Sequence, residues 1–152
     1  HERASDEIRG SVWSLDIRSG GIENVVAGLR GLAFRGGFVF GLDPEPTLSR
    51  LEADGSLVAA LVTTLPDKCF VDVALVYCAV PAGYDFSSVD RYYQRKVYTA
   101  DTLLLFDEEE AQLLVDGREE AFDMWRIQKA GGQIYFLSRR DGLIYEVSER
   151  LE

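Results

Sequence analysis

The sequence predicts one α+β domain, made mostly of strands with short helices near the N-terminus. The 152 residues have the size of a single domain, and a composition of 47% hydrophobic and 28% charged residues is typical of globular chains. Apolar stretches of strand length recur along the chain. Helical spacing of apolar residues occurs only in the first third. With no repeat or linker, we expect a single domain over residues 1–152.

The first third of the chain predicts two short helices. Residues 11–18 alternate in polarity and predict a strand, which Gly20 and Gly21 end. Residues 22–32 carry apolar side chains at helical spacing and predict a short amphipathic helix. A short strand or a tight loop follows. Thr47 is then expected to cap a second short helix.

The rest of the chain predicts strands. Residues 57–65 form an apolar run that predicts a buried strand, and residues 69–80 predict one central strand because they are almost continuously apolar and rich in β-branched side chains. Residues 84–101 are polar and rich in tyrosine, and we expect an excursion there. Further strands are predicted at 103–106, 111–115, 121–128, 133–138 and 143–147.

Cysteine and histidine usage limits the possible chemistry. Cys69 and Cys78 are too few for a disulfide scaffold or a zinc cluster. On one straight strand they would lie about 30 Å apart, so they can pair only if the chain bends between them, and two buried thiols are the default expectation. His1 is the only histidine, which leaves nucleophile systems of the Ser-His-Asp or Cys-His type without a base. No metal site is predicted.

The charge of the chain restricts its partners. With 26 acidic and 16 basic residues, the net charge is −10 and the pI is about 4.6. Such a surface disfavours nucleic acid and anionic membranes. No apolar run approaches the ~20 residues of a membrane helix, so we expect no membrane insertion. We expect a monomer with a protein partner.

The order of several short motifs resembles the cholera and heat-labile enterotoxin A-subunit family. The opening strand and the Gly-Leu-x-x-Arg-Gly element that follows it are matched here by Trp13, Asp16, Arg18, Leu32, Arg35 and Gly36. Later blocks follow in the family's order, at 61–64, 73–81, 84–86, 108–111 and 121–127. The resemblance covers roughly residues 12–128.

The resemblance implies a mono-ADP-ribosyltransferase fold, in which two packed β-sheets flank a cleft for NAD. A glutamate of this family stabilises the oxocarbenium-like ribosyl cation, and the match places it at Glu110, with Glu108 aiding the acceptor. The resemblance further implies that the cofactor NAD is held by residues of the opening strand and of a Ser-Thr-Ser strand, here Trp13, Asp16, Arg18, Thr63 and Thr64.

Two departures from the family pattern weaken the expected NAD site. The arginine that clamps the NAD phosphates falls on Ser14, and the first serine of Ser-Thr-Ser falls on Val62. Loss of one charge-assisted phosphate contact weakens binding by about 2–5 kcal/mol. On the expected strand, Arg18 lies on the same face as Ser14 but about 13 Å from it, so it is poorly placed to replace the missing arginine.

Three functional hypotheses follow. The first is a secreted, effector-like or toxin-like pseudoenzyme that binds a target or host protein and uses no cofactor. The second is an active NAD-dependent transferase that uses another arginine, such as Arg18 or Arg35. The third is an acidic immunity or adaptor module. The departures favour a protein without enzyme activity.

A basic, tyrosine-rich segment is the predicted partner-binding surface. Its aromatic residues are expected to be exposed and alternate with basic ones, and Tyr and Arg are common at the centres of interfaces. The residues concerned are Tyr84, Arg91, Tyr92, Tyr93 and Arg95, flanked by Phe86, Lys96 and Tyr98.

Overall fold

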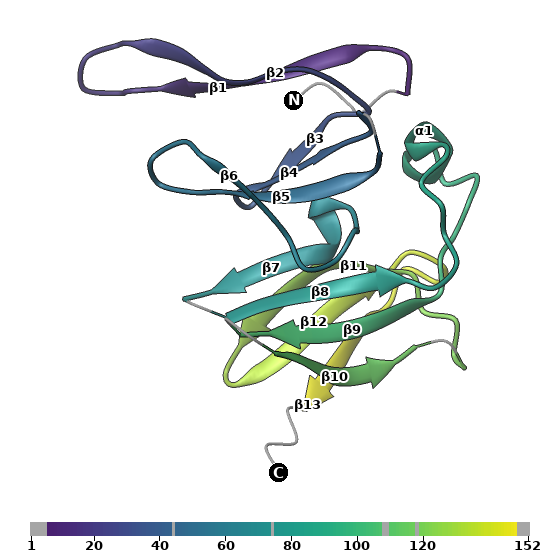
Figure 1. Ribbon diagram of the computed structural model, residues 1–152. Helices are drawn as coiled ribbons and strands as arrows, with labels where there is room; N and C mark the ends of the chain where they lie inside the picture. Colours follow the sequence, from purple (N-terminus) through teal and green to yellow (C-terminus); the bar gives the residue numbers. More distant parts are fainter. Residues whose placement is uncertain (1–5, 44, 74, 108–109, 118, 149–152) are drawn as a thin grey trace. The chain divides into compact units, whose positions relative to one another are not determined.

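The computed structural model describes residues 6–43, 45–73, 75–107, 110–117 and 119–148, and these are mostly antiparallel strands (Figure 1). They contain thirteen strands, one short 3-10 helix and one α-helix of five residues. The sheet-rich character is confirmed, whereas the α+β class with N-terminal helices is wrong.

The chain divides into two compact units. Unit 1 comprises residues 1–66 and 86–96, and unit 2 comprises residues 67–85 and 97–152. The single domain over 1–152 stays a prediction.

A long β-hairpin opens unit 1 (Figure 1). Strand β1 (Arg9–Leu15) pairs antiparallel with β2 (Ile22–Arg30), with irregular register after Gly10 and after Val12. The turn is organised by Asp16, whose carboxylate accepts hydrogen bonds from the Arg18 N–H (2.9 Å) and the Ser19 hydroxyl (2.5 Å). These bonds, that of Ser19 first, hold the pKa of Asp16 below its usual value.

The remaining strands of unit 1 form a four-stranded antiparallel meander. Its order is β3 (Ala33–Arg35), β4 (Phe38–Gly41), β5 (Thr47–Leu51) and β6 (Leu57–Ala59). A small apolar cluster joins the hairpin to this sheet through Val12, Val26 and Val39. The α-helix of unit 1 is α1 (Val89–Tyr93).

Both predicted N-terminal helices are strands. Residues 22–32 contain three β-branched side chains and Gly28, whose φ of 72° lies outside the helical region. Thr47 begins β5, which lies between β4 and β6. A short isolated helix is marginal in water, and pairing with neighbouring strands satisfies the same backbone groups. The expected buried strand over 57–65 is also shorter, because only Leu57–Ala59 pair and these residues are exposed.

Two antiparallel sheets make up unit 2. The first is a meander of β7 (Cys69–Asp72), β8 (Leu75–Pro81), β9 (Asp101–Phe106) and β10 (Ala111–Asp116). The second contains β11 (Met124–Ala130), β12 (Gln133–Ser138) and β13 (Ile144–Ser148). Side chains of both sheets share one core, made by Tyr77, Ala79, Leu103, Met124, Ile127, Ile134 and Phe136. The strands predicted at 111–115, 121–128, 133–138 and 143–147 are confirmed within a few residues.

The predicted central strand over 69–80 is instead a hairpin closed by a disulfide. The chain reverses at Val73, and Cys69 then lies directly opposite Cys78 in the β7–β8 register. Their Cα atoms are 4.2 Å apart and their sulfurs are bonded. The expectation of two buried thiols is therefore wrong, because the bend that pairing requires is present.

Candidate functional site

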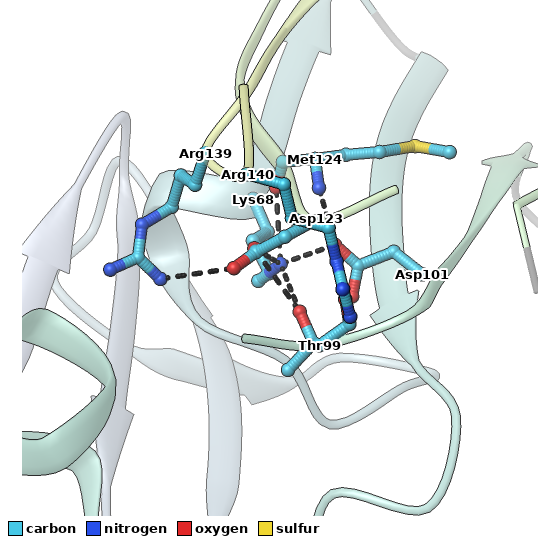
Figure 2. Close-up of polar contacts among 7 residues, drawn as sticks. All are labelled: Lys68, Thr99, Asp101, Asp123, Met124, Arg139 and Arg140. Carbon is cyan, nitrogen blue, oxygen red and sulfur yellow. Dashed lines mark hydrogen bonds and ion pairs between the residues drawn. The ribbon is translucent and has the colours of Figure 1, made fainter. Parts of the chain in front are cut away.

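A buried charged cluster lies in unit 2, where several strand ends and loops meet (Figure 2). Lys68 ends the 3-10 helix η1 (Pro66–Lys68), Asp101 begins β9, and Asp123 directly precedes β11. The side chains of all three have no exposed surface. Charged groups are rarely buried so completely unless they are paired, so these residues form the most unusual polar arrangement in unit 2.

The Lys68 ammonium group is the centre of the cluster. Its Nζ donates to Asp101 Oδ2 and, at 2.9 Å, to Asp123 Oδ1. It also donates to the Thr99 hydroxyl at 3.0 Å and to the Met124 carbonyl at 3.1 Å. These acceptors replace the water that the ammonium group loses on burial.

The carboxyl group of Asp101 has an uneven environment. Its Oδ2 accepts from Lys68 and from the Met124 N–H at 2.6 Å, whereas its buried Oδ1 has no hydrogen-bond partner among the described residues. Burial raises the pKa of Asp101, and the nearby Lys68 charge opposes this rise. The neutral form of the Asp101 carboxyl group is therefore more favoured in the protein than it would be in water.

Asp123 joins the two cations of the cluster. Its Oδ1 accepts from Lys68 and from the Thr99 hydroxyl (3.1 Å), and its Oδ2 accepts from Arg139 Nη1 at 3.2 Å. The Arg139 guanidinium also lies over the rings of Trp125 (5.0 Å) and Tyr98 (5.8 Å). These ring contacts hold Arg139 over the cluster.

Backbone hydrogen bonds fix the loops that carry these side chains. Asp101 N–H donates to the Phe122 carbonyl (2.8 Å), and Arg139 N–H donates to the Asp123 carbonyl (2.9 Å). The charges of the two carboxylates, Asp101 and Asp123, and of the two cations, Lys68 and Arg139, add up to zero. Passing a proton from Lys68 to Asp101 would leave that sum unchanged, so the cluster can support proton transfer without creating a net buried charge.

The predicted NAD-binding residues of the opening strand lie in unit 1. Trp13 and Ser14 are exposed on β1, and Ser14 is paired with Glu23. Asp16 and Arg18 lie in the β1–β2 turn, where Asp16 has the structural contacts given above.

The other predicted site residues lie outside regular strands or outside the described residues. Val62, Thr63 and Thr64 belong to the irregular connection between β6 and η1, and Thr64 is buried. Glu110 is exposed just before β10, and its N–H donates to Asp107 Oδ1 at 2.9 Å. Glu108 lies outside the described residues. The roles of all these residues toward NAD stay predictions.

The predicted partner segment is only partly exposed. Tyr92 has no exposed surface and contacts the ring of Tyr93 edge-on at 5.8 Å, and Phe86 is buried, so the expected exposure of these two aromatic residues is wrong. Tyr92 faces inward because it lies on the buried side of α1 with Val89. Arg91 and Arg95 are exposed in unit 1, whereas Tyr84 is half-buried in unit 2.

A second candidate surface is the distal end of the β1–β2 hairpin. Large apolar side chains are exposed there: 60% of Trp13, 59% of Leu15, 90% of Ile17 and 69% of Ile22. Leu15 lies opposite Ile22, and Trp13 shares their face because it is two residues away. We call these four residues the hairpin tip.

Sequence reasoning missed the buried cluster. The available signals were single acids beside apolar runs, namely Asp101 before a leucine run and Asp123 inside Ala-Phe-Asp-Met-Trp. Lys68 directly precedes the most apolar strand region. Each position alone is typical of a strand end, and only the sheet topology brings the three together.

Comparison with protein-family models, with curated proteins and with solved structures found no significant match to this chain. Among the described residues no group of His, Cys, Asp and Glu side chains is suited to hold a metal ion. No helix in the described part of the chain has the length and apolarity to cross a membrane.

Proposed function

We propose that this chain is a protein-binding module that works in an oxidising environment, such as outside the cell, and that it acts without turning over NAD. The observation that carries the proposal is the hairpin tip, a group of four exposed large apolar side chains at the end of the β1–β2 hairpin. Contiguous apolar patches on a protein surface are typical of interaction sites.

The backbone of the hairpin adds a second means of binding. β1 and β2 form a two-stranded sheet, so in the described part of the chain the outer edge of each strand has no further strand in its ladder. A partner strand can add to such an edge through main-chain hydrogen bonds, while the side chains of the tip provide selectivity.

The net charge of −10 favours a partner with a basic surface.

The disulfide supports the proposed environment. Cys69–Cys78 links neighbouring strands of unit 2, and disulfides persist mainly in secreted proteins and other oxidising compartments. This agrees with the secreted effector-like hypothesis drawn from the sequence.

We propose that the chain does not turn over NAD because it differs from the enterotoxin A-subunit pattern at the positions expected to hold NAD. Ser14 cannot make the charge-assisted contact of an arginine to the NAD phosphates. Thr63 and Thr64 lie in an irregular connection, where the family has a supporting strand.

Affinity capture with matched variants tests the binding surface. We would immobilise the wild-type chain and the double variant Trp13→Ser/Ile17→Ser, and quantify captured proteins by mass spectrometry. Leu143→Ser/Ile144→Ser is the control, because it removes two exposed apolar side chains (58% and 74% exposed) from unit 2. The proposal expects one or more partners that are lost at least tenfold with the tip variant and retained with the control. Equal capture by all three proteins would contradict it.

Partner binding by the basic segment around α1 stays a prediction, and a separate variant tests it. Arg91→Glu/Arg95→Glu reverses two exposed charges without touching the hairpin tip. Loss of the captured partner with this variant alone would show that the basic segment, and not the hairpin tip, is the binding surface.

A further inference from the structure

We infer that Lys68 and Asp101 become joined by an intramolecular isopeptide bond, which links the end of η1 covalently to the start of β9. The inference goes beyond partner binding and concerns unit 2 alone. It rests on a buried amine held against a buried carboxyl group, with a second carboxylate on the same nitrogen (Figure 2).

The reacting groups are already in place. Lys68 Nζ is hydrogen-bonded to Asp101 Oδ2, which is one bond from the carbon that would be attacked. Both side chains have no exposed surface. Because the two groups are held in contact, no bimolecular encounter is needed. In well-oriented intramolecular reactions this corresponds to an effective concentration of about 10⁵–10⁸ M. Burial also excludes the water that would favour hydrolysis.

The surroundings of Asp101 suit an electrophile. Burial raises its pKa and so favours the neutral acid over the unreactive carboxylate. The Met124 N–H, 2.6 Å from Oδ2, would stabilise the negative charge that develops on this oxygen during attack. Oδ1 has no hydrogen-bond partner among the described residues, so its departure costs none of the hydrogen bonds described here.

Asp123 is placed to move the proton. Its Oδ1 lies 2.9 Å from Lys68 Nζ, within the range for general base catalysis. Its other oxygen accepts from Arg139, whose charge balances that of the carboxylate.

The atoms and charges balance without any co-reactant. A proton passes from the Lys68 ammonium to the Asp101 carboxylate, to which it is hydrogen-bonded, giving a neutral amine and a neutral acid. Nζ then attacks Cγ, so that an N–C bond forms. Asp123 takes a proton from the nitrogen and passes it to the Oδ1 hydroxyl, and the Cγ–Oδ1 bond breaks as water leaves. Nothing is oxidised or reduced, and Asp123 and Arg139 remain as a balanced pair.

The intact mass of the wild-type chain tests the inference. The chain is purified, denatured and reduced, so that the disulfide does not contribute. We expect a mass lower by one water than the sequence requires, with the loss located by fragmentation in a branched peptide that joins Lys68 to Asp101. A reduced chain with the full sequence mass would overturn the inference, and so would a water loss located elsewhere.

The position of the water loss must be determined because other sites can also lose water. The chain has three Asp-Gly pairs, which can form succinimides, beginning at Asp54, Asp116 and Asp141. A matched control lies in the same unit, where Lys129 and Asp72 are 3.3 Å apart but 21% and 37% exposed. No cross-link is expected there.

Variants separate the roles of the residues. Lys68→Arg and Asp101→Ala should show the full mass of their sequences. Asp101→Asn should lose ammonia instead of water and reach the same cross-linked mass as the wild type. Asp123→Ala should accumulate uncross-linked chain, and its full cross-linking would overturn the role given to Asp123. Because the wild-type mass alone decides whether the bond exists, a variant that fails to fold leaves the test intact.

Discussion

Asp43 shows how a single carboxylate ties the β4–β5 connection to both strands of the hairpin. Its Oδ1 accepts from Arg30 Nε at 2.8 Å, and its Oδ2 accepts from Arg9 Nη1 at 2.8 Å. The hydrogen bond with Arg30, followed by the charges of Arg30 and Arg9, holds the pKa of Asp43 below its usual value of 3.8. The native state therefore favours the ionised form.

This shift predicts a pH dependence. Because the folded pKa is lowered, the stabilisation is complete above about pH 4 and is lost as the pH falls through the lower folded pKa. Asp43→Asn should reduce the free energy of unfolding at about pH 6, and this difference from the wild type should shrink at about pH 2. Urea unfolding at both pH values measures it. A difference that stays constant with pH would refute the assignment.

Position 117 requires glycine because the backbone there lies too close to Asp101 and Met124 to leave room for a side chain. A Cβ atom at this position would lie 2.3 Å from the Asp101 carbonyl oxygen and 2.9 Å from Met124 Cε. Gly117→Ala should destabilise the chain by about 1–3 kcal/mol, the usual cost of overpacking. Gly21→Ala, which meets only the Ser19 hydroxyl at 3.2 Å, is the control. Equal thermal unfolding temperatures of the two variants would contradict this packing.

At the scale of elements, α1 depends on a cap from outside the helix. Asp6 Oδ1 accepts from the Val89 N–H and Asp6 Oδ2 from the Ser88 hydroxyl, both at 2.8 Å. Asp6→Ala should cost about 1 kcal/mol of stability, measured by chemical denaturation, whereas Asp6→Asn should retain most of it because an acceptor remains. Unfolding of all three proteins at the same denaturant concentration would show that this cap contributes nothing.

The disulfide stabilises the β7–β8 hairpin. Its cysteines are nine residues apart, and closing a loop of this length in the unfolded chain is worth about 2–3 kcal/mol in the loop-entropy model. Reductant should lower the thermal unfolding temperature of the wild type. It should leave Cys69→Ser/Cys78→Ser unchanged. A wild type that is equally insensitive to reductant would argue against the bond.

Strand periodicity predicted the second half of the chain well. Residues 133–138 alternate in burial, as half-buried strands do, and form β12. The β7–β8 turn was missed because Val73 lies where a turn signal such as glycine or asparagine is usual, although its φ is 55°. Residues 22–32 were missed because their apolar spacing fits a helix as well as a strand, and the partner strand decided the outcome.

The buried cluster depends on contacts that local sequence patterns do not encode. Lys68 meets Asp101 and Asp123 across separations of 33 and 55 residues. Only the sheet formed by β7, β8, β9 and β10, together with the packing of β11, brings these positions together. The hairpin tip was similarly obscured, because Trp13 was interpreted through the resemblance as a cofactor-binding residue.

Across the whole molecule, the proposed binding surface and the buried charged cluster belong to different units. The exposed apolar groups of the hairpin tip belong to unit 1, and the fully buried charges belong to unit 2. The proposed function uses the first, and the proposed cross-link would strengthen the second. Neither requires a cofactor.

A turnover assay with labelled NAD tests most directly whether the chain acts by binding a partner and not by cleaving NAD. Nicotinamide release and transfer of label to protein would both be followed, in the presence of the captured partner, with Glu110→Ala as the control. We expect neither product, and no NAD binding at millimolar concentration. Turnover that is lost in Glu110→Ala would contradict this expectation and identify an active transferase.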